Sequence, residues 1–136
     1  MPKISLIISS DKLDRLYPAA ILANTSANMG WKAELFFTFW GLIALRKGGG
    51  PPEVSSDYSQ YKGSLAKMVE SGALPEWKVL LREAKKGGKV KIYACSTTMG
   101  AFNIKEEDLE DFVDGVVGAS TFLSKAENAQ ITLFVS

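Results

Sequence analysis

The only cysteine of this sequence, Cys95, is its best candidate for a nucleophile. It follows the apolar stretch of residues 89–94, which has the pattern of a core strand, and it precedes a Ser-Thr-Thr-Met-Gly turn. Backbone N–H groups and a helix dipole at such a turn favour a thiolate and lower the pKa of the thiol. A thiolate attacks sulfane or thiosulfonate sulfur without a general base. The alternative interpretation is that Cys95 is a small buried hydrophobic residue.

The residue types that are missing narrow the chemistry further. The sequence contains no histidine, which excludes Ser-His and Cys-His nucleophile pairs and imidazole metal ligands. One cysteine cannot form an intrachain disulfide, a CxxC redox pair or an iron–sulfur site. We therefore predict no metal and no cofactor. An unpaired thiol also favours a reducing, cytoplasmic location.

Polar and aromatic residues that follow predicted strands are the candidate substrate-binding residues. These are Ser9, Ser10, Thr38, Trp40, Ser96, Thr97 and Thr98. The hydroxyls of residues 96–98 could donate hydrogen bonds to the Cys95 thiolate or to an anion, and Lys12 is a candidate for a nearby positive charge. Thr38 and Trp40 could line a cleft. The aromatic run of residues 36–40 is also explained as core or as an oligomer contact, because aromatic residues dominate both kinds of burial.

Two other patterns are interpreted as structural. The acidic residues are Glu106, Glu107, Asp108, Glu110, Asp111 and Asp114. They are spread around a predicted helix, which is typical of a solvated face rather than of a metal site. The run Gly48-Gly49-Gly50 is followed by no Lys-Ser or Lys-Thr pair, so it does not predict a phosphate-binding loop.

Strands and helices are predicted to alternate along the chain. Strands are expected at residues 3–9, 32–38, 89–94, 116–117 and 131–135. Helices are expected from Leu13 to Gly30, at residues 39–47 and 61–70, from Pro75 to Gly87, around residues 109–113 and at residues 120–128. This order predicts a doubly wound α/β fold, with five mainly parallel strands and helices on both faces. In a flavodoxin-like strand order, residues 9–11 would lie beside residues 95–97.

Length and composition fit one globular domain over residues 1–136. Hydrophobic residues make up 46% of the chain, charged residues 23%, and the net charge is +1. That charge offers no field to attract nucleic acid or an anionic membrane. The most apolar segment, residues 35–45, is too short to span a bilayer, and no signal peptide is recognised at the start. We therefore expect neither nucleic-acid nor membrane binding.

Several segments resemble the DsrE/DsrF-like proteins, and the similarity extends over nearly the whole chain. The most specific is Phe-Phe-Thr-Phe-Trp-Gly-Leu at residues 36–42, and Tyr-Ala-Cys-Ser-Thr-Thr-Met follows at 93–99. The start of the chain, its first predicted helix, residues 115–126 and residues 131–135 are also similar. The match is closest to the DsrE/DsrF/DsrH-like branch, which is often labelled "peroxiredoxin family".

This resemblance implies a flavodoxin-like fold, a homo-oligomer (dimer, trimer or hexamer) and cytoplasmic sulfur trafficking. Cys95 stands where such relatives carry sulfane sulfur or thiosulfonate, and the implied partner is a small sulfur-carrier protein. Many relatives have Cys-x-Met-Ser-Met where this chain has Cys95-Ser-Thr-Thr-Met99, and residues 48–74 match no familiar pattern. Peroxiredoxin chemistry is poorly supported, because the chain has no second cysteine to resolve a sulfenic acid.

Three functions therefore compete. The first is a sulfur carrier or sulfurtransferase that uses Cys95. The second is an oligomeric module that binds a small anion, a nucleotide or an acyl-thioester cofactor, with a structural cysteine. The third is a scaffold subunit without chemistry of its own. An exposed thiol with a low pKa supports the first function, whereas a fully buried thiol supports the other two.

Overall fold

A five-stranded parallel sheet forms the centre of the molecule in the computed structural model, which describes residues 1–136. The strands are β1 (Lys3–Ile8), β2 (Lys32–Phe37), β3 (Val90–Cys95), β4 (Gly115–Val117) and β5 (Ile131–Val135). Their order across the sheet is β4-β3-β2-β1-β5, and every neighbouring pair is parallel. The predicted α/β class with five parallel strands is thus confirmed.

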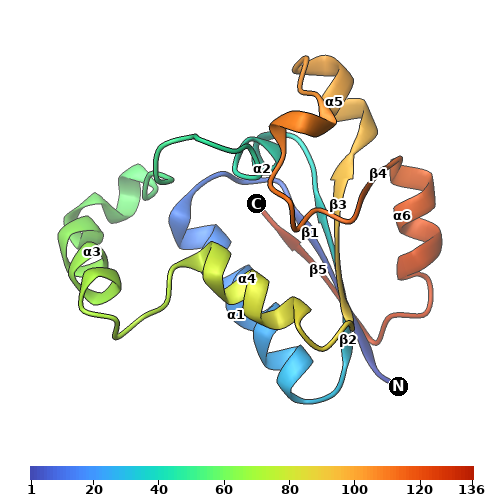
Figure 1. The fold of residues 1–136 in the computed structure, drawn as a ribbon, viewed down its shortest axis with the longest axis horizontal. Helices are drawn as coiled ribbons and strands as arrows, with labels where there is room; N and C mark the ends of the chain where they lie inside the picture. Colours follow the sequence, from blue (N-terminus) through green and yellow to red (C-terminus); the bar gives the residue numbers. More distant parts are fainter.

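Helices cover both faces of this sheet. They are α1 (Leu13–Asn28), α2 (Trp40–Ile43), α3 (Lys62–Glu70), α4 (Trp77–Lys85), α5 (Ser96–Ala101) and α6 (Ala119–Ala126). Helices α1 and α4 pack on one face, α6 lies on the other, and α5 sits at the end of the sheet where β3 finishes (Figure 1). Helix α3 lies at the periphery, beyond α1 and α4 (Figure 1).

Alternation along the strands divides the interior into two unequal clusters. Ile4, Leu6 and Ile8 of β1 belong to a cluster of 24 buried residues that includes the inner faces of α1 and α4. The residues between them face the opposite side, because successive side chains of a strand point to opposite faces. On that side Phe36 and Cys95 form a small cluster with Phe122 of α6. The Cys95 side chain therefore lies on the α6 face of the sheet.

The strand order differs from the flavodoxin-like order that we expected. Strands β1, β2, β3 and β4 are neighbours in chain order, and β5 lies on the other side of β1. Strand β2 therefore lies between β1 and β3. Residues 9–11 consequently do not lie beside residues 95–97. The end of β2 takes that place, since the register pairs Phe37 with Ala94 and leaves Thr38 next to Cys95.

The predicted helix around residues 109–113 is wrong. A short 3₁₀ turn at Glu106–Asp108 is followed by irregular chain that is tied to its neighbours by backbone bonds from Glu110 N–H to Leu45 and from Asp114 N–H to Ile92. The acidic side chains meet the basic face of α4 in the pairs Lys78–Glu110, Arg82–Asp111 and Lys85–Asp114. Glu110, Asp111 and Asp114 are therefore partners of α4, whereas Glu106, Glu107 and Asp108 are exposed in the 3₁₀ turn.

The apolar segment at residues 35–45 contributes to the core. Leu35, Phe37, Leu42 and Leu45 are all fully buried in the larger cluster. None of the helices has the length and apolar character needed to cross a membrane.

Candidate functional site around Cys95

Cys95 is the last residue of β3 and comes directly before α5. Its side chain is buried, with only 4% of the residue exposed. Phe36 and Phe122 pack against it, and their rings stack on each other with centroids 4.7 Å apart. The thiol therefore has an apolar wall on the α6 side.

Two threonine hydroxyls complete the surroundings of the thiol. Thr98 is buried in the first turn of α5, and its Oγ1 lies 3.3 Å from Oγ1 of Thr38 at the end of β2. The same Thr98 oxygen accepts a hydrogen bond of 2.9 Å from the backbone N–H of Phe39. Because Thr98 Oγ1 already accepts this bond, its own hydrogen is available to be donated.

The balance of these contacts favours the thiolate. Burial raises the pKa of the Cys95 thiol, because it penalises the charged form. Hydrogen bonds from the hydroxyls of Thr98 and Thr38, and from the backbone N–H groups of Thr98 and Thr97, act in the opposite direction. Their combined effect is larger, so the pKa of Cys95 lies below its usual value. The site can thus hold a negative charge without a histidine or a lysine.

Exposed aromatic residues lie beside this site. Phe39 and Trp40 follow Thr38, and about half of each residue is exposed (51% and 52%). Both rings contact Phe102, with centroid distances of 5.6 Å from Phe39 and 5.4 Å from Trp40. Phe39 adopts a positive φ of 52°, which is unfavourable for a bulky residue, and its N–H bond to Thr98 helps to hold it there. We call Phe39, Trp40 and Phe102 the aromatic cluster.

Glycine at position 41 allows α2 to approach the end of β1. A Cβ at this position would lie 2.2 Å from the backbone oxygen of Ile8, well inside any permitted contact. The Thr38 N–H also donates to this Ile8 oxygen at 3.0 Å. This close contact fixes the segment that carries Thr38 and the aromatic cluster.

The predicted site residues fall into two groups. Thr38, Thr97 and Thr98 surround Cys95, while Ser96 is exposed at the start of α5 and Trp40 lies in the aromatic cluster. Ser9 and Ser10 lie at the end of β1, on the far side of β2. The Ser9 N–H donates to Val135, and the Ser10 hydroxyl accepts from the N–H of Lys12.

The expected positive charge is also located elsewhere. Lys12 stands at the start of α1. The pKa of Glu53 is lowered mainly by its hydrogen bond from Lys62, and the charge of Lys12 adds to this effect.

The residues that the sequence analysis missed are Phe102 and Phe122. Each follows a predicted strand by several positions, and no local pattern distinguishes it from an ordinary core residue.

Comparison with known proteins assigns the chain to a described family. A family model described as "DsrE/DsrF/DrsH-like family" matches residues 1–71 and 55–134. The chain is 28% identical over 162 aligned positions to "Sulfur carrier protein DsrE2" of Allochromatium vinosum, covering 98% of both chains. It is 26% identical to "Uncharacterized protein YrkE" of Bacillus subtilis, covering 98% of this chain and 96% of that protein.

Solved structures share the fold. The ychN protein from E. coli superposes with a TM-score of 0.63 at 16% identity, covering 98% of this chain and 99% of that one. BT1422 from Bacteroides thetaiotaomicron gives a TM-score of 0.60 at 14% identity, with 98% and 94% covered. MTH1491 from Methanobacterium thermoautotrophicum gives 0.56 at 17% identity, with 98% and 99% covered. At these identities the likeness concerns the fold alone.

Proposed function

This chain belongs to the DsrE/DsrF/DrsH-like family, and we propose that it carries sulfane sulfur or a thiosulfonate group on Cys95 and passes it to a partner protein. The observation that carries the proposal is a buried thiol placed beside hydroxyl and backbone N–H donors of Thr38, Thr97 and Thr98, which lower its pKa. A cysteine with a purely structural role needs no donors aimed at its charged form. The relative named as a sulfur carrier, at 28% identity, supports the same role.

Loading and release follow the rules of thiol–disulfide exchange. With tetrathionate, the Cys95 thiolate attacks one of the two central sulfur atoms, the central S–S bond breaks, and thiosulfate leaves with the electron pair. The product is a thiosulfonate on Cys95. With a polysulfide, the thiolate takes the attacked sulfur as a persulfide and a shorter polysulfide leaves. An acceptor thiolate then attacks the sulfur bonded to Cys95 Sγ, the bond to Sγ breaks, and the acceptor takes the sulfur or thiosulfonate group while Cys95 leaves as a thiolate.

The donors of the free thiolate also suit the loaded forms. A persulfide and a thiosulfonate both carry negative charge, and both accept hydrogen bonds from hydroxyl and backbone N–H groups. Ser96 and Thr97 are exposed in the first turn of α5 and can reach a group that extends outward from Cys95. In this proposal Ser96 and Thr97, two of the residues predicted as substrate-binding, contact the loaded group, whereas Ser9 and Ser10 do not.

The burial of Cys95 favours a second candidate function. A thiol that is 4% exposed is compatible with an oligomeric module in which Cys95 only fills space beside Phe36 and Phe122. In that case the residue would not react with sulfur donors, and binding of a small anion, a nucleotide or an acyl-thioester cofactor would be the function. Reactivity at Cys95 separates the two candidates.

We further propose that the protein acts as a cytoplasmic homo-oligomer (dimer, trimer or hexamer) and delivers to a small sulfur-carrier protein. The unpaired thiol is suited to a reducing compartment. The aromatic cluster next to Cys95 offers an apolar surface on which an acceptor protein could place its own thiol. The exposed apolar side chains of β5 offer a contact between copies.

Peptide mapping by mass spectrometry tests the proposal. The protein is incubated with tetrathionate or with polysulfide, alkylated and digested. We expect a reductant-sensitive adduct on the peptide that contains Cys95, and none in Cys95→Ser, whose circular dichroism spectrum should be unchanged. An unmodified Cys95 peptide after both treatments would support the structural role.

A further inference from the structure

We propose that the cavity between α1, α3 and α4 binds a small, mostly apolar, uncharged molecule with a hydrogen-bond acceptor such as a carbonyl group. The cavity has a volume of about 320 Å³, within the usual range for small-molecule sites. Its lining includes residues of α3, whereas Cys95 packs against Phe122 of α6, and α3 and α6 lie on opposite sides of the sheet (Figure 1). Nothing in the proposed sulfur chemistry uses it.

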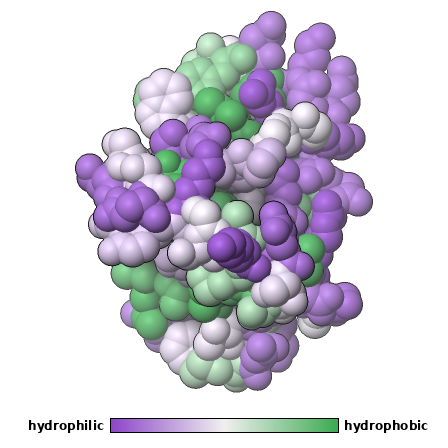
Figure 2. All heavy atoms as spheres, turned by 90° about the vertical axis from the view of Figure 1, so that its left-hand side faces the viewer, coloured by the Kyte–Doolittle hydropathy of each residue, from purple (hydrophilic) through white to green (hydrophobic).

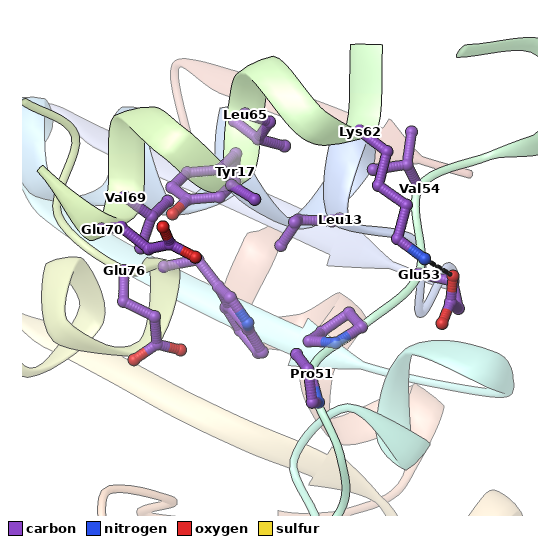
Figure 3. A pocket seen from close by; sticks show the side chains of 13 residues that line it. Leu13, Tyr17, Pro51, Glu53, Val54, Lys62, Leu65, Val69, Glu70 and Glu76 are labelled. Atoms are coloured by element: carbon purple, nitrogen blue, oxygen red, sulfur yellow. Dashed lines mark hydrogen bonds and ion pairs between the residues drawn. The ribbon is translucent and has the colours of Figure 1, made fainter. Parts of the chain in front are cut away.

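The walls of this cavity are apolar. They are formed by Leu13 and Tyr17 of α1, by Leu65, Ala66 and Val69 of α3, by Pro51, Pro52 and Val54 of the preceding loop, and by Trp77 of α4. Figure 3 shows Leu13, Leu65 and Val69 directed toward the same space. On the outside, Figure 2 shows the α3 side as a surface where hydrophilic side chains border hydrophobic ones. An apolar ligand would pack against these walls, which are partly exposed to water.

Trp77 indicates which polar group the ligand should carry. The residue is 1% exposed and lines the cavity, and its indole Nε1–H is fully buried without a hydrogen-bond partner, so an acceptor reaches this group when the side chains around it shift. A buried donor without a partner costs free energy that an incoming acceptor would recover. The indole nitrogen can only donate, so the complementary group is an acceptor.

The charges around the cavity argue against an anionic ligand. Glu70 and Glu76 lie at one end, and neither forms an ion pair. At the other end the only lysine, Lys62, is already paired with Glu53 at 2.8 Å (Figure 3). Burial, followed by the charge of Glu76, raises the pKa of the Tyr17 hydroxyl, which agrees with a negative potential here. An uncharged acceptor therefore fits better than a carboxylate.

The loop that closes the cavity is held in place. Ser55 donates two hydrogen bonds to the Asp14 carboxylate, from its N–H at 2.7 Å and from its hydroxyl at 2.8 Å. The Leu13 N–H donates to the backbone oxygen of Glu53 at 2.8 Å. These bonds fix the loop to the start of α1, so the loop wall of the cavity is already formed before a ligand binds.

Three matched probes test the proposal on the full-length protein. Benzophenone is uncharged and carries a carbonyl, diphenylmethane has a similar shape without an acceptor, and 4-benzoylbenzoate adds a negative charge. We expect benzophenone to bind about fivefold or more tighter than either of the others, because only it satisfies Trp77 without repulsion. Titrations followed by ¹⁵N-edited NMR should shift the Trp77 indole signal and leave those of Trp31 and Trp40 in place.

Variants locate the binding. Ala66→Phe fills the cavity and should abolish benzophenone binding, whereas Ala119→Phe at an exposed position of α6 should not. Trp77→Phe keeps an aromatic ring and should remove the preference for benzophenone over diphenylmethane. Equal affinity for these two probes, binding that survives in Ala66→Phe, or binding without a shift of the Trp77 signal would each overturn the proposal. Cys95→Ser should bind as the wild type does, so this result is independent of the sulfur chemistry.

Discussion

At the scale of single residues, two opposing effects meet at the Cys95 thiol. Burial beside Phe36 and Phe122 disfavours the charged form, while the donors from Thr38, Thr97 and Thr98 favour it. Because the donors prevail, the thiolate fraction rises as the pH increases through a pKa that lies below the ordinary value of a cysteine thiol. Nucleophilic attack needs the thiolate, so the reaction rate follows the same profile.

Thr98→Val should raise the pKa of Cys95 by about one pH unit or more, because a hydrogen bond to a charged group contributes about 1.5–3 kcal/mol. The rate of alkylation by iodoacetamide, measured against pH, gives this pKa. The wild type should reach its half-maximal rate at a lower pH than an unperturbed cysteine thiol does, and the variant should be shifted upward.

Thr98→Ser is the matched control, because it keeps the hydroxyl that donates to the thiol and accepts from Phe39. It should stay close to the wild type. A wild-type thiol that titrates above the ordinary value, or one that resists iodoacetamide in the native state, would contradict the assignment of these donors.

Some of these residues were predictable and others were not. Cys95 and residues 96–98 are adjacent in sequence, so the end of an apolar strand was enough to bring them together. Ser9 and Ser10 depended on strand order, which is decided by long-range packing that no local pattern records. Thr38 takes their place because β2 is the strand next to β3.

At the scale of elements, the approach of α2 to the end of β1 depends on Gly41. Gly41→Ala would place a methyl group 2.2 Å from the backbone oxygen of Ile8. This oxygen belongs to the main chain, so it cannot move aside as the end of a flexible side chain could. We expect the free energy of unfolding to fall by about 1–3 kcal/mol or more, as measured by urea denaturation.

Gly63→Ala provides the comparison. Gly63 lies in α3, and nothing stands within 4 Å of a Cβ added there. Alanine has the higher helix propensity, so this variant should be neutral or more stable by up to about 1 kcal/mol. Equal losses in both variants would show that the contact with Ile8 is unimportant.

The bond between Asp14 and Ser55 makes stability depend on pH. Partial burial raises the pKa of Asp14, but the hydrogen bonds from Ser55 lower this pKa by more than burial raises it. The folded-state pKa therefore lies below the unfolded value of about 3.9. A depressed folded-state pKa contributes stability above the unfolded pKa, and this stability is lost as the pH falls through the folded pKa. Asp14→Asn should therefore cost about 1 kcal/mol at neutral pH.

Urea denaturation at several pH values measures this effect. The difference between wild type and Asp14→Asn should be full at pH 7 and should shrink as the pH falls below about 3.9. A difference that is constant over this range would mean that the carboxylate charge is not responsible.

The elements that the sequence did not predict were decided by tertiary contacts. Leu109, Phe112 and Val113 have helical spacing, and Leu109 and Phe112 are indeed buried, but in an irregular segment. Ion pairs with α4 and backbone bonds to Leu45 and Ile92 outweigh the helical preference of this segment. The alternation of strands and helices elsewhere follows local hydrophobic patterns, so it was predictable.

At the scale of the whole molecule, the edge strand β5 remains uncovered. Phe134 is 64% exposed, and Ile131 and Leu133 are also exposed on the other face of this strand. An edge strand with exposed apolar residues readily pairs with another chain. We therefore expect a closed homo-oligomer in sedimentation experiments at micromolar concentration, with β5 in the contact.

Phe134→Glu should shift the sedimentation toward the monomer, because it places a charge in the contact. Ile21→Glu, at an exposed position of α1, should leave the oligomer intact. A wild-type protein that sediments as a single 14.8 kDa species would contradict the proposed assembly.

The fold class could be predicted from the sequence, whereas the cavity under α3 could not. Residues 48–74 include the run of glycines and prolines and show no familiar pattern, yet they supply most of the cavity wall. Their placement depends on hydrogen bonds that involve side chains, such as those from the N–H and the hydroxyl of Ser55 to the Asp14 carboxylate. Such contacts join residues that are far apart in sequence, so the hydrophobic and turn patterns of short segments do not predict them.

The release of sulfur from Cys95 tests the central claim most directly. The protein is loaded with polysulfide, freed of excess reagent and treated with cyanide, which attacks the outer sulfur of a persulfide and leaves as thiocyanate while the Cys95 thiolate is restored. We predict close to one thiocyanate per chain for the wild type and none for Cys95→Ser, with the intact mass of the wild type returning to its unloaded value. Equal amounts of thiocyanate from both proteins, or none from either, would contradict a carrier role for Cys95.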